Sequence, residues 1–451
     1  MKSKPVVKPV FEYALNRIDF YRSENYKALR NLDSKNLENT LKNVPVISGD
    51  SFLDDFYKFI PDTRTSISLF QTSGSTGRPK VIPSTYKDME IFSQAFINMY
   101  KDLLGEMPYL TVNVSPPRPA ISGAAMSYIS EMGNSIELNP GPGQGLVEIL
   151  RKCDSILNSH PKMNKKILIT SLPSLLFREI YNLDKKTREE LNALVRKNEI
   201  YIGLGGEPLN LERSRLLYFL MPVKGVINIL ASTERICSSK FYTEDMLKSD
   251  DTRDISVFKV SRYNNELGIY SNSKVYYPSN NKSKGLEGEL LLTSKGLKGY
   301  DHAPLINYNT KEKVRFVGID KDYMYLEFLG RTNKLINLGV SKLDDIIIDD
   351  VLAFTSRKLN LGEGYAEITR EDGLDKITFY FYKNEFKGSK EELINIILDK
   401  LSKEEMELKY VLDKKLASLD AELVDKDKIP FYDPKKLKSP KIVDKREIEH
   451  Y

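Results

Sequence analysis

Short apolar runs alternate with amphipathic stretches from about residue 67 to residue 300, and this alternation most constrains the fold. Strands covered on both faces read as continuous apolar runs, whereas the helices that cover them keep one polar face. The pattern therefore predicts an α/β fold whose strands are substantially buried. Four of the runs are KILITSLP (166–173), YIGLGGEPL (201–209), KGVINILAS (224–232) and GELLLTS (288–294).

The character of the sequence changes near residue 333. Residues 11–60 mix aromatic and charged residues in a helical rhythm and form a helical lead-in to the alternating region. Beyond residue 333 come a helical stretch, a strand pair with Asp372-Gly373 at its turn, and the amphipathic stretch KEELINIILDKLSKEEME. We therefore predict two domains, residues 1–332 with mixed sheets and helices and residues 333–451 as a small α+β unit.

Composition excludes several classes of protein. Hydrophobic residues make up 41% of the 451 residues and charged residues 29%, which is ordinary for a globular chain. Two cysteines leave no room for a disulfide framework or a cysteine-based zinc site. The three histidines are widely separated in the sequence, which argues against a histidine metal site. The N-terminus lacks the apolar run of a signal peptide, and no segment reaches the roughly 18 apolar residues of a membrane span. We expect a cytoplasmic location.

The segment TSGSTGRPK (72–80) concentrates hydrogen-bond donors. Gly74 and Gly77 let backbone N–H groups approach a ligand, the hydroxyl groups add donors, and Lys80 adds positive charge. With an apolar strand before it and an amphipathic helix after it, such a loop suits a polyphosphate. The P-loop kinase motif does not occur, because the two glycines are only three positions apart. By composition alone, the segment also fits an ordinary surface turn.

All nine residues of this loop agree with [ST]-S-G-[ST]-T-G-x-P-K, so the chain resembles the adenylate-forming superfamily. That superfamily includes acyl-CoA synthetases, nonribosomal-peptide adenylation domains and luciferases. The resemblance implies that a carboxylate and ATP give an acyl-adenylate and pyrophosphate, and that the loop binds the departing phosphates. The nucleotide-binding residues it implies here are Thr72, Ser73, Gly74, Ser75, Thr76, Gly77 and Lys80.

Further segments resemble superfamily motifs in the same order. GGEPL (205–209) resembles the G-G-E-x-L segment beside the adenine, and LASTE (230–234) resembles the aromatic-G-x-T-E segment. The resemblance implies that Thr233 meets the α-phosphate and that Glu234 coordinates Mg²⁺, whose hard charge prefers carboxylate oxygen. It also implies cofactor-binding roles for Gly206, Glu207, Pro208, Leu230, Ala231 and Ser232.

Two later segments continue the series. PLINYNTKE (304–312) resembles P-x-I-R-Y-x-T-G-D, with Glu312 in place of the ribose-binding aspartate. GRTNKLINLGV (330–340) resembles G-R-x-D-x-I-x-x-x-G, with Arg331 retained and Asn333 in place of the hinge aspartate. The resemblance therefore implies that residues 1–332 bind ATP and the acid. It also implies that the C-terminal unit is mobile and rotates about Asn333.

The end of the chain resembles one branch of the superfamily. KIPFYDPKKLKSPKIVDKREI is similar to the G-K-x-x-R-V-x-D-x-R ending of phenylacetate–CoA ligase and its relatives. This alignment carries the family's adenylation lysine onto Lys438. The lysines around it also fit a solvated basic face, and the few interleaved aromatic residues give little support to nucleic-acid binding.

Several positions depart from the superfamily's patterns. Leu230 stands where an aromatic residue usually stacks on the adenine, and such stacking is worth roughly 1–3 kcal/mol per base. Glu312 is one methylene longer than aspartate, and Leu437 stands where a glycine precedes the lysine. An active divergent enzyme and a noncatalytic nucleotide-binding relative both accommodate these changes. Further departures are Ala231, Asn307, Lys311, Asn333 and Pro440.

We interpret the chain as an acid–thiol ligase that uses ATP and Mg²⁺, with CoA as the second substrate. The small carboxylic acid, of aromatic or medium size, is expected between residues 113–133 and 203–235. There Gly123, Ala124 and Ala125 leave space, and Met126 or Tyr128 would line the pocket. Acyl transfer to an amine or a protein side chain is the alternative within the same fold. We expect no nucleic-acid partner, and the sequence carries no signal for an oligomer.

Overall fold

The structure is a computed structural model that describes residues 4–31, 37–53, 55–72, 79–115, 120–140, 145–207, 209–249, 257–331, 336–338, 341–343, 345–371, 374–384, 386–404, 411–415, 417–430 and 441–446. Within these ranges, no helix has the length and apolar character needed to cross a membrane.

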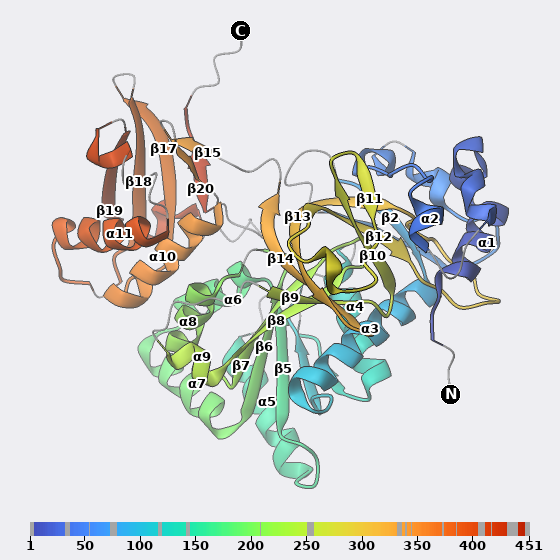
Figure 1. The fold of residues 1–451 in the computed structure, drawn as a ribbon. Helices are drawn as coiled ribbons and strands as arrows, with labels where there is room; N and C mark the ends of the chain where they lie inside the picture. The colour runs from blue at the N-terminus through green and yellow to red at the C-terminus, as the bar shows by residue number, and fades with distance from the viewer. Residues whose placement is uncertain are drawn as a thin grey trace.

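One large mixed sheet dominates the molecule and confirms the predicted α/β fold (Figure 1). The described residues give it twelve strands, parallel from β4 to β7 and largely antiparallel beyond β7. In spatial order they are β11 (Lys274–Tyr276), β10 (Asn265–Ser271), β12 (Glu287–Ser294), β13 (Tyr308–Ile319), β14 (Tyr323–Arg331), β9 (Val257–Ser261), β8 (Cys237–Thr243), β7 (Gly225–Ala231), β6 (Glu199–Gly205), β5 (Lys166–Ser171), β3 (Leu110–Asn113) and β4 (Ile136–Leu138).

Helices cover both faces of the parallel half of this sheet. On β5, Ile167 and Ile169 pack into one hydrophobic core and Leu168 into another. Burial on both faces explains why these strands read as unbroken apolar runs. One face carries α3 (Tyr86–Leu104) and α4 (Ile121–Gly133); the other carries α5 (Leu146–Ser159), α6 (Pro173–Asn182), α7 (Lys185–Lys197), α8 (Leu211–Leu220) and α9 (Glu244–Lys248).

The N-terminal segment packs against the antiparallel half of the sheet. Phe11, Tyr21 and Phe59 share a buried core with Leu290 and Tyr308. The structure thus has the helical lead-in that the sequence predicts. Its helices are α1 (Val7–Arg17), η1 (Asp19–Arg22), η2 (Glu24–Asn31), α2 (Leu37–Leu41), η3 (Gly49–Phe52) and η4 (Phe56–Phe59), and η5 (Asn281–Ser283) precedes β12.

The hydroxyl-rich segment connects two paired strands. β1 (Ile67–Gln71) leads into it, and β2 (Val81–Thr85) follows it and pairs antiparallel with β1. The Thr72 N–H donates to the Lys80 carbonyl at 3.0 Å, and the Lys80 N–H donates to Thr72 Oγ1 at 3.0 Å. α3 begins only after β2, where Thr85 forms a capping box with Asp88. The amphipathic helix expected after the loop is α3, and pairing with β1 keeps residues 81–85 extended between the loop and that helix.

The C-terminal residues form a second sheet in the order β19 (Ala417–Val424), β18 (Leu374–Tyr382), β17 (Gly364–Glu371) and β20 (Ile442–Asp444). α10 (Asp345–Leu359) and α11 (Lys390–Glu404) pack around its separate core (Figure 1). This arrangement confirms the predicted strand pair and the amphipathic helix. The domain division at residue 333 stays a prediction, and Asn333 lies outside the described residues. β15 (Ile336–Leu338), β16 (Ser341–Leu343) and η6 (Lys426–Lys428) complete the set.

Candidate functional site

The predicted nucleotide segments lie at neighbouring strand ends. β6 and β7 are parallel, with Gly205 opposite Ile229, so residues 206–207 and 230–234 follow the same edge of the sheet. The chain turns there from β7 into the antiparallel β8, and Thr233 and Glu234 lie in that turn. Ligands in α/β folds characteristically bind at the carboxyl ends of such strands. The geometry therefore makes this edge the candidate site.

Lys80, Glu234 and Tyr308 meet at this edge from three separate segments. The Tyr308 hydroxyl donates to Glu234 Oε1 at 2.8 Å. Lys80 Nζ lies 3.4 Å from the same oxygen and 3.2 Å from the Tyr308 hydroxyl. Tyr308 is fully buried and Glu234 is 8% exposed, whereas the Lys80 side chain keeps 30% of its surface exposed. The lysine at the end of the phosphate loop thus contacts the carboxylate that the resemblance assigns to Mg²⁺.

Glu234 is held in its ionised form. Burial raises the pKa of Glu234, but the charge of Lys80 and the hydrogen bond from Tyr308 outweigh it, so the pKa lies below the ordinary value. A buried carboxylate without such partners would take up a proton instead. The site therefore presents a negative charge at neutral pH beside a cation that remains partly exposed.

These residues fit a magnesium ion held mainly by a nucleotide. Among the described residues, no group of three or more histidine, cysteine, aspartate or glutamate side chains could hold a metal ion. Glu234 would therefore be a single carboxylate ligand, and phosphate and water oxygens would supply the remaining positions. Mg²⁺ typically binds in this manner, through one or two carboxylates together with substrate phosphates.

Two predicted cofactor-binding residues, Glu312 and Arg331, are adjacent in the antiparallel half of the sheet. Glu312 on β13 lies directly opposite Arg331 on β14. Tyr308 begins the same strand β13, which links this pair to Glu234. Lys311, where the superfamily has glycine, has φ +63°, a backbone conformation that glycine adopts without strain. At Lys311 the backbone of β13 therefore has a conformation suited to the glycine of the superfamily pattern, with a different side chain.

The G-G-E segment is engaged within the protein. Glu207 Oε2 accepts from the Ser174 N–H at 2.8 Å and from the Ser174 hydroxyl at 2.6 Å, near the start of α6. Its other oxygen, Oε1, is buried without a hydrogen-bond partner. Gly206 has φ +82° and is exposed. Leu230, Ala231 and Ser232 are half-buried along the end of β7.

Several predicted site residues lie outside the described residues, and their positions stay predictions. Thr72 and Lys80, the first and last residues of the 72–80 segment, are described. Thr233 and Glu234 lie in one turn, and Lys80 contacts Glu234. The side chain of Arg331 is likewise outside the described part, although its strand is not. The predicted residues without a described position are Ser73, Gly74, Ser75, Thr76, Gly77, Pro208 and Lys438.

Sequence reasoning missed two residues that shape the site. Tyr308 lies inside the PLINYNTKE segment and matches the tyrosine of the superfamily pattern, so that match was an available signal. Gly49 lies in η3, and a Cβ added to it would meet Lys80 Nζ at 2.7 Å. No local sequence signal marks Gly49, because this proximity involves a lysine 31 positions later in the chain.

The sequence placed the acid beside residues 113–133, most of which form α4. Ala125 and Met126 are buried in the core shared with α3, and Met126 Sδ accepts from the Tyr100 hydroxyl at 3.9 Å. Tyr128 is half-buried and packs edge-on against Tyr86, with ring centroids 5.7 Å apart. Of the side chains considered for the acid pocket, Tyr128 therefore keeps an accessible surface, and Met126 is a core residue.

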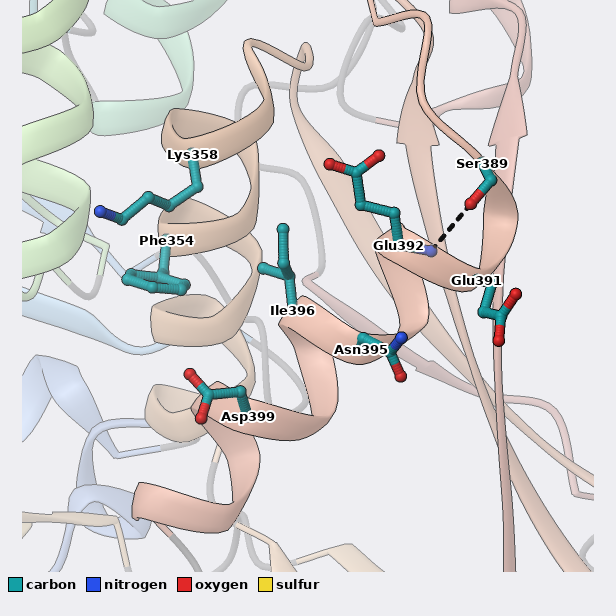
Figure 2. A pocket seen from close by; sticks show the side chains of 8 residues that line it. All are labelled: Phe354, Lys358, Ser389, Glu391, Glu392, Asn395, Ile396 and Asp399. Carbon is teal, nitrogen blue, oxygen red and sulfur yellow. Dashed lines mark hydrogen bonds between the residues drawn. The ribbon is translucent and has the colours of Figure 1, made fainter.

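An open groove of about 650 Å³ lies on the C-terminal sheet's helices, between α10 and α11. Figure 2 shows Phe354 and Ile396 between charged side chains, with the Glu392 N–H bound to Ser389 Oγ. None of the predicted site residues lines this groove. Three of its four charged side chains are carboxylates, which repel phosphate, so the groove is not a candidate for nucleotide binding.

Solved structures share this fold. 2-Hydroxyisobutyryl-CoA ligase in the postadenylation state with 2-HIB-AMP aligns with a TM-score of 0.63 and 15% identity, over 97% of this chain and 88% of that chain. The same ligase with 2-HIB-AMP and CoA in the thioesterification state aligns with a TM-score of 0.52 and 17% identity, over 98% and 88% of the two chains. No model of a protein family and no curated protein matches the sequence. The chain has the fold of this CoA ligase.

Proposed function

We propose that this protein is an AMP-forming acid–thiol ligase of the adenylate-forming superfamily. The observation that carries the proposal is the meeting of Lys80 and Glu234, 154 positions apart in the sequence, on the fold of a CoA ligase. Both belong to segments that match superfamily motifs, and the match alone implies that they share a nucleotide. The neighbouring ligase was captured with 2-HIB-AMP and with CoA, which supports the same classes of substrate here.

The reaction has two steps. A carboxylate oxygen of the acid attacks the α-phosphorus of ATP, the bond from that phosphorus to the bridging oxygen breaks, and pyrophosphate leaves with the electron pair. The sulfur of a thiol then attacks the acyl carbon, AMP leaves, and the thiol proton passes to solvent. Charge on the phosphate oxygens grows during the first step, so fixed positive groups stabilise its transition state.

The residues of this chain divide that work. Lys80 and the donors of residues 72–80 hold the phosphates, Thr233 binds the α-phosphate, and Lys438 of the C-terminal domain stabilises the developing charge. Mg²⁺, when bound by Glu234, would supply positive charge beside the phosphates. Tyr308 holds Glu234 in place through its hydroxyl. Rotation about Asn333 would then withdraw Lys438 and admit the thiol.

The direct test of the first step is exchange of radioactive pyrophosphate into ATP. We expect purified protein with ATP and Mg²⁺ to catalyse this exchange only when a suitable carboxylic acid is present. A panel of aromatic, arylacetic and medium-chain acids covers the expected range. Absence of acid-dependent exchange across that panel contradicts the ligase proposal. ATP binding without exchange would instead support the noncatalytic alternative that Leu230 and Glu312 motivate.

The acid and its acceptor are proposed from the branch that the C-terminus resembles. Similarity to phenylacetate–CoA ligase favours an aromatic acid and CoA, and the half-buried Tyr128 at the expected pocket is consistent with an aromatic ring. Mass spectrometry of products formed with CoA or with free amino acids separates a thioester from an amide. Formation of the amide alone would replace the ligase proposal with acyl transfer to an amine.

Tyr308→Phe is expected to weaken binding of ATP with Mg²⁺ roughly tenfold. The substitution removes the 2.8 Å hydrogen bond to a buried carboxylate, and bonds to charged groups contribute about 1.5–3 kcal/mol. Isothermal titration calorimetry with ATP and Mg²⁺ measures the change. Tyr277→Phe is the matched control, because it removes a similarly buried hydroxyl that bonds Asn307 instead. Equal losses in both variants would contradict a specific role for Tyr308.

A further inference from the structure

Arg235 directly follows Glu234 and is an unusual residue for its backbone conformation. Its φ is +69°, in the left-handed region that side chains with a Cβ rarely adopt. The residue is 4% exposed, so a flexible cation is buried at a strained position beside the site. Such conformations persist where surrounding contacts fix them, and they concentrate at functional sites.

The Arg235 guanidinium joins two segments that also carry site residues. It donates to Ser84 Oγ at 3.0 Å, and Ser84 lies on β2, four residues after Lys80. It donates to the Ala303 carbonyl at 2.8 Å, and Ala303 lies five residues before Tyr308. Arg235 itself belongs to the turn of Glu234. One side chain therefore connects the three segments that supply Lys80, Glu234 and Tyr308.

Asp88 completes this junction from the first turn of α3. Its Oδ2 lies 3.3 Å from Arg235 and accepts from the Ala303 N–H at 2.8 Å. Its Oδ1 contacts His302 Nδ1 at 3.1 Å. The charge of Arg235 is thus paired inside the protein with Asp88, a residue that is only 6% exposed. This pairing leaves no reason to assign the arginine to a ligand.

The backbone of Arg235 is fixed as firmly as its side chain. Its N–H donates to the Ser232 carbonyl at 2.9 Å, which closes the turn around Thr233 and Glu234. Its carbonyl accepts from the side-chain amides of Asn264 at 2.7 Å and Asn265 at 2.9 Å. The turn that carries Glu234 is therefore held through both the backbone and the side chain of the residue that follows it.

We infer that Arg235 is a positioning residue: it fixes the Glu234 turn relative to Lys80 and Tyr308, and so sets the distance between the phosphate loop and the carboxylate. The inference rests on the proposed function, because the groups that Arg235 positions are those proposed to hold ATP with Mg²⁺. It assigns Arg235 no contact with substrate. The arginine acts through the other three residues.

The first test uses the full-length protein without ligand. Hydrogen exchange measured by mass spectrometry is compared for wild type, Arg235→Gln and Arg235→Lys. We expect Arg235→Gln to accelerate exchange together in peptides covering residues 79–85, 229–237 and 303–309. Lysine keeps the charge and is expected to restore protection in part. Leu157→Ala, a buried change in α5 away from the site, is the control for general destabilisation.

The second test measures how strongly Mg²⁺ improves ATP binding. We expect the gain in ATP affinity on adding Mg²⁺ to be at least tenfold smaller in Arg235→Gln than in wild type. In Leu157→Ala we expect the gain to be unchanged. Unchanged exchange in the three peptides, or equal changes in Leu157→Ala, would overturn the inference. If wild type binds no ATP while Arg235→Gln still loosens the three segments, the proposed function fails and the positioning role remains.

Discussion

Glu234→Gln is expected to lower the rate of acid-dependent pyrophosphate exchange by about 10²–10³-fold, which is the usual cost of removing one charged group that stabilises a transition state. Glutamine has the same shape and can still accept the hydrogen bond from Tyr308, so the change removes charge with little change in packing. Without the carboxylate, the site loses the ligand proposed here for Mg²⁺, and Lys80 loses its buried counter-charge. The measurement is kcat/KM for ATP in the exchange assay, with the melting temperature recorded alongside.

A matched control separates this effect from a general loss of negative charge. Glu199 begins β6, whose other end reaches the site, and it accepts from the Tyr201 hydroxyl at 3.0 Å. Glu199→Gln makes the same chemical change at the opposite end of that strand. We expect it to leave the exchange rate within about twofold of wild type. If Glu234→Gln keeps more than about a tenth of wild-type activity, a carboxylate at residue 234 is not required.

Arg213→Met is expected to lower the free energy of unfolding by about 3–5 kcal/mol, the usual result when one partner of a buried ion pair is removed. Arg213 on α8 is 2% exposed and donates to Asp349 on α10 at 2.6 Å and to Glu363, just before β17, at 2.9 Å. Lys441 also donates to Glu363, at 2.6 Å. Methionine preserves much of the apolar stem but leaves two buried carboxylates with less positive charge. Urea unfolding measures the loss.

Two companion variants identify the cause. Arg151→Met removes an arginine from an exposed pair with Glu190 and should change stability little, because solvent screens such pairs. Adding Asp349→Asn and Glu363→Gln to Arg213→Met neutralises the remaining carboxylates and should recover part of the loss. A triple variant no more stable than Arg213→Met would show that packing, rather than unpaired charge, causes the effect.

The pH dependence of the Arg213 effect has a defined sign. Burial raises the pKa of Glu363, but the charges of Arg213 and Lys441 outweigh it, so the pKa lies below the ordinary value of 4.5. The carboxylate therefore contributes stability above pH 4.5, and that contribution is lost as the pH falls through the lowered pKa. Arg213→Met removes a charge that lowers the pKa of Glu363, so that pKa rises in the variant. The difference in the free energy of unfolding between wild type and variant should therefore become smaller as the pH falls from about 7 to about 4. A constant difference would contradict this account.

The Arg213 cluster also bears on the proposed rotation. It joins a helix of the large sheet to the C-terminal sheet, so any rotation about Asn333 must separate these charges or carry them into water. Arg213→Met is therefore expected to change the second step, thiol attack, more than the first. Rapid-quench measurement of acyl-adenylate formation and of its discharge to CoA separates the two rates.

Local sequence determined much of the fold. The apolar runs at 166–173, 201–209 and 224–232 form β5, β6 and β7, because strands buried on both faces need unbroken apolar side chains. The lead-in helices and the final amphipathic helix follow from periodicity, which depends on neighbours a few positions away. The donor-rich composition of residues 72–80 likewise suits a polyphosphate, and the resemblance of residues 230–234 to a superfamily motif implies the nucleotide roles proposed for Thr233 and Glu234.

Tertiary structure alone decided how these pieces meet. The sequence predicted a strand before residues 72–80 and a helix after them, but it did not show the strand β2 at residues 81–85, because that strand forms by pairing with β1. Tyr308 reaches Glu234 across 74 positions, and Arg213 reaches Glu363 across 150. Strand register and helix packing set such contacts, whereas periodicity and capping depend only on residues a few positions apart in the sequence. The motifs therefore came from the sequence, and the positions that Arg235, Tyr308 and Arg213 occupy came from the fold.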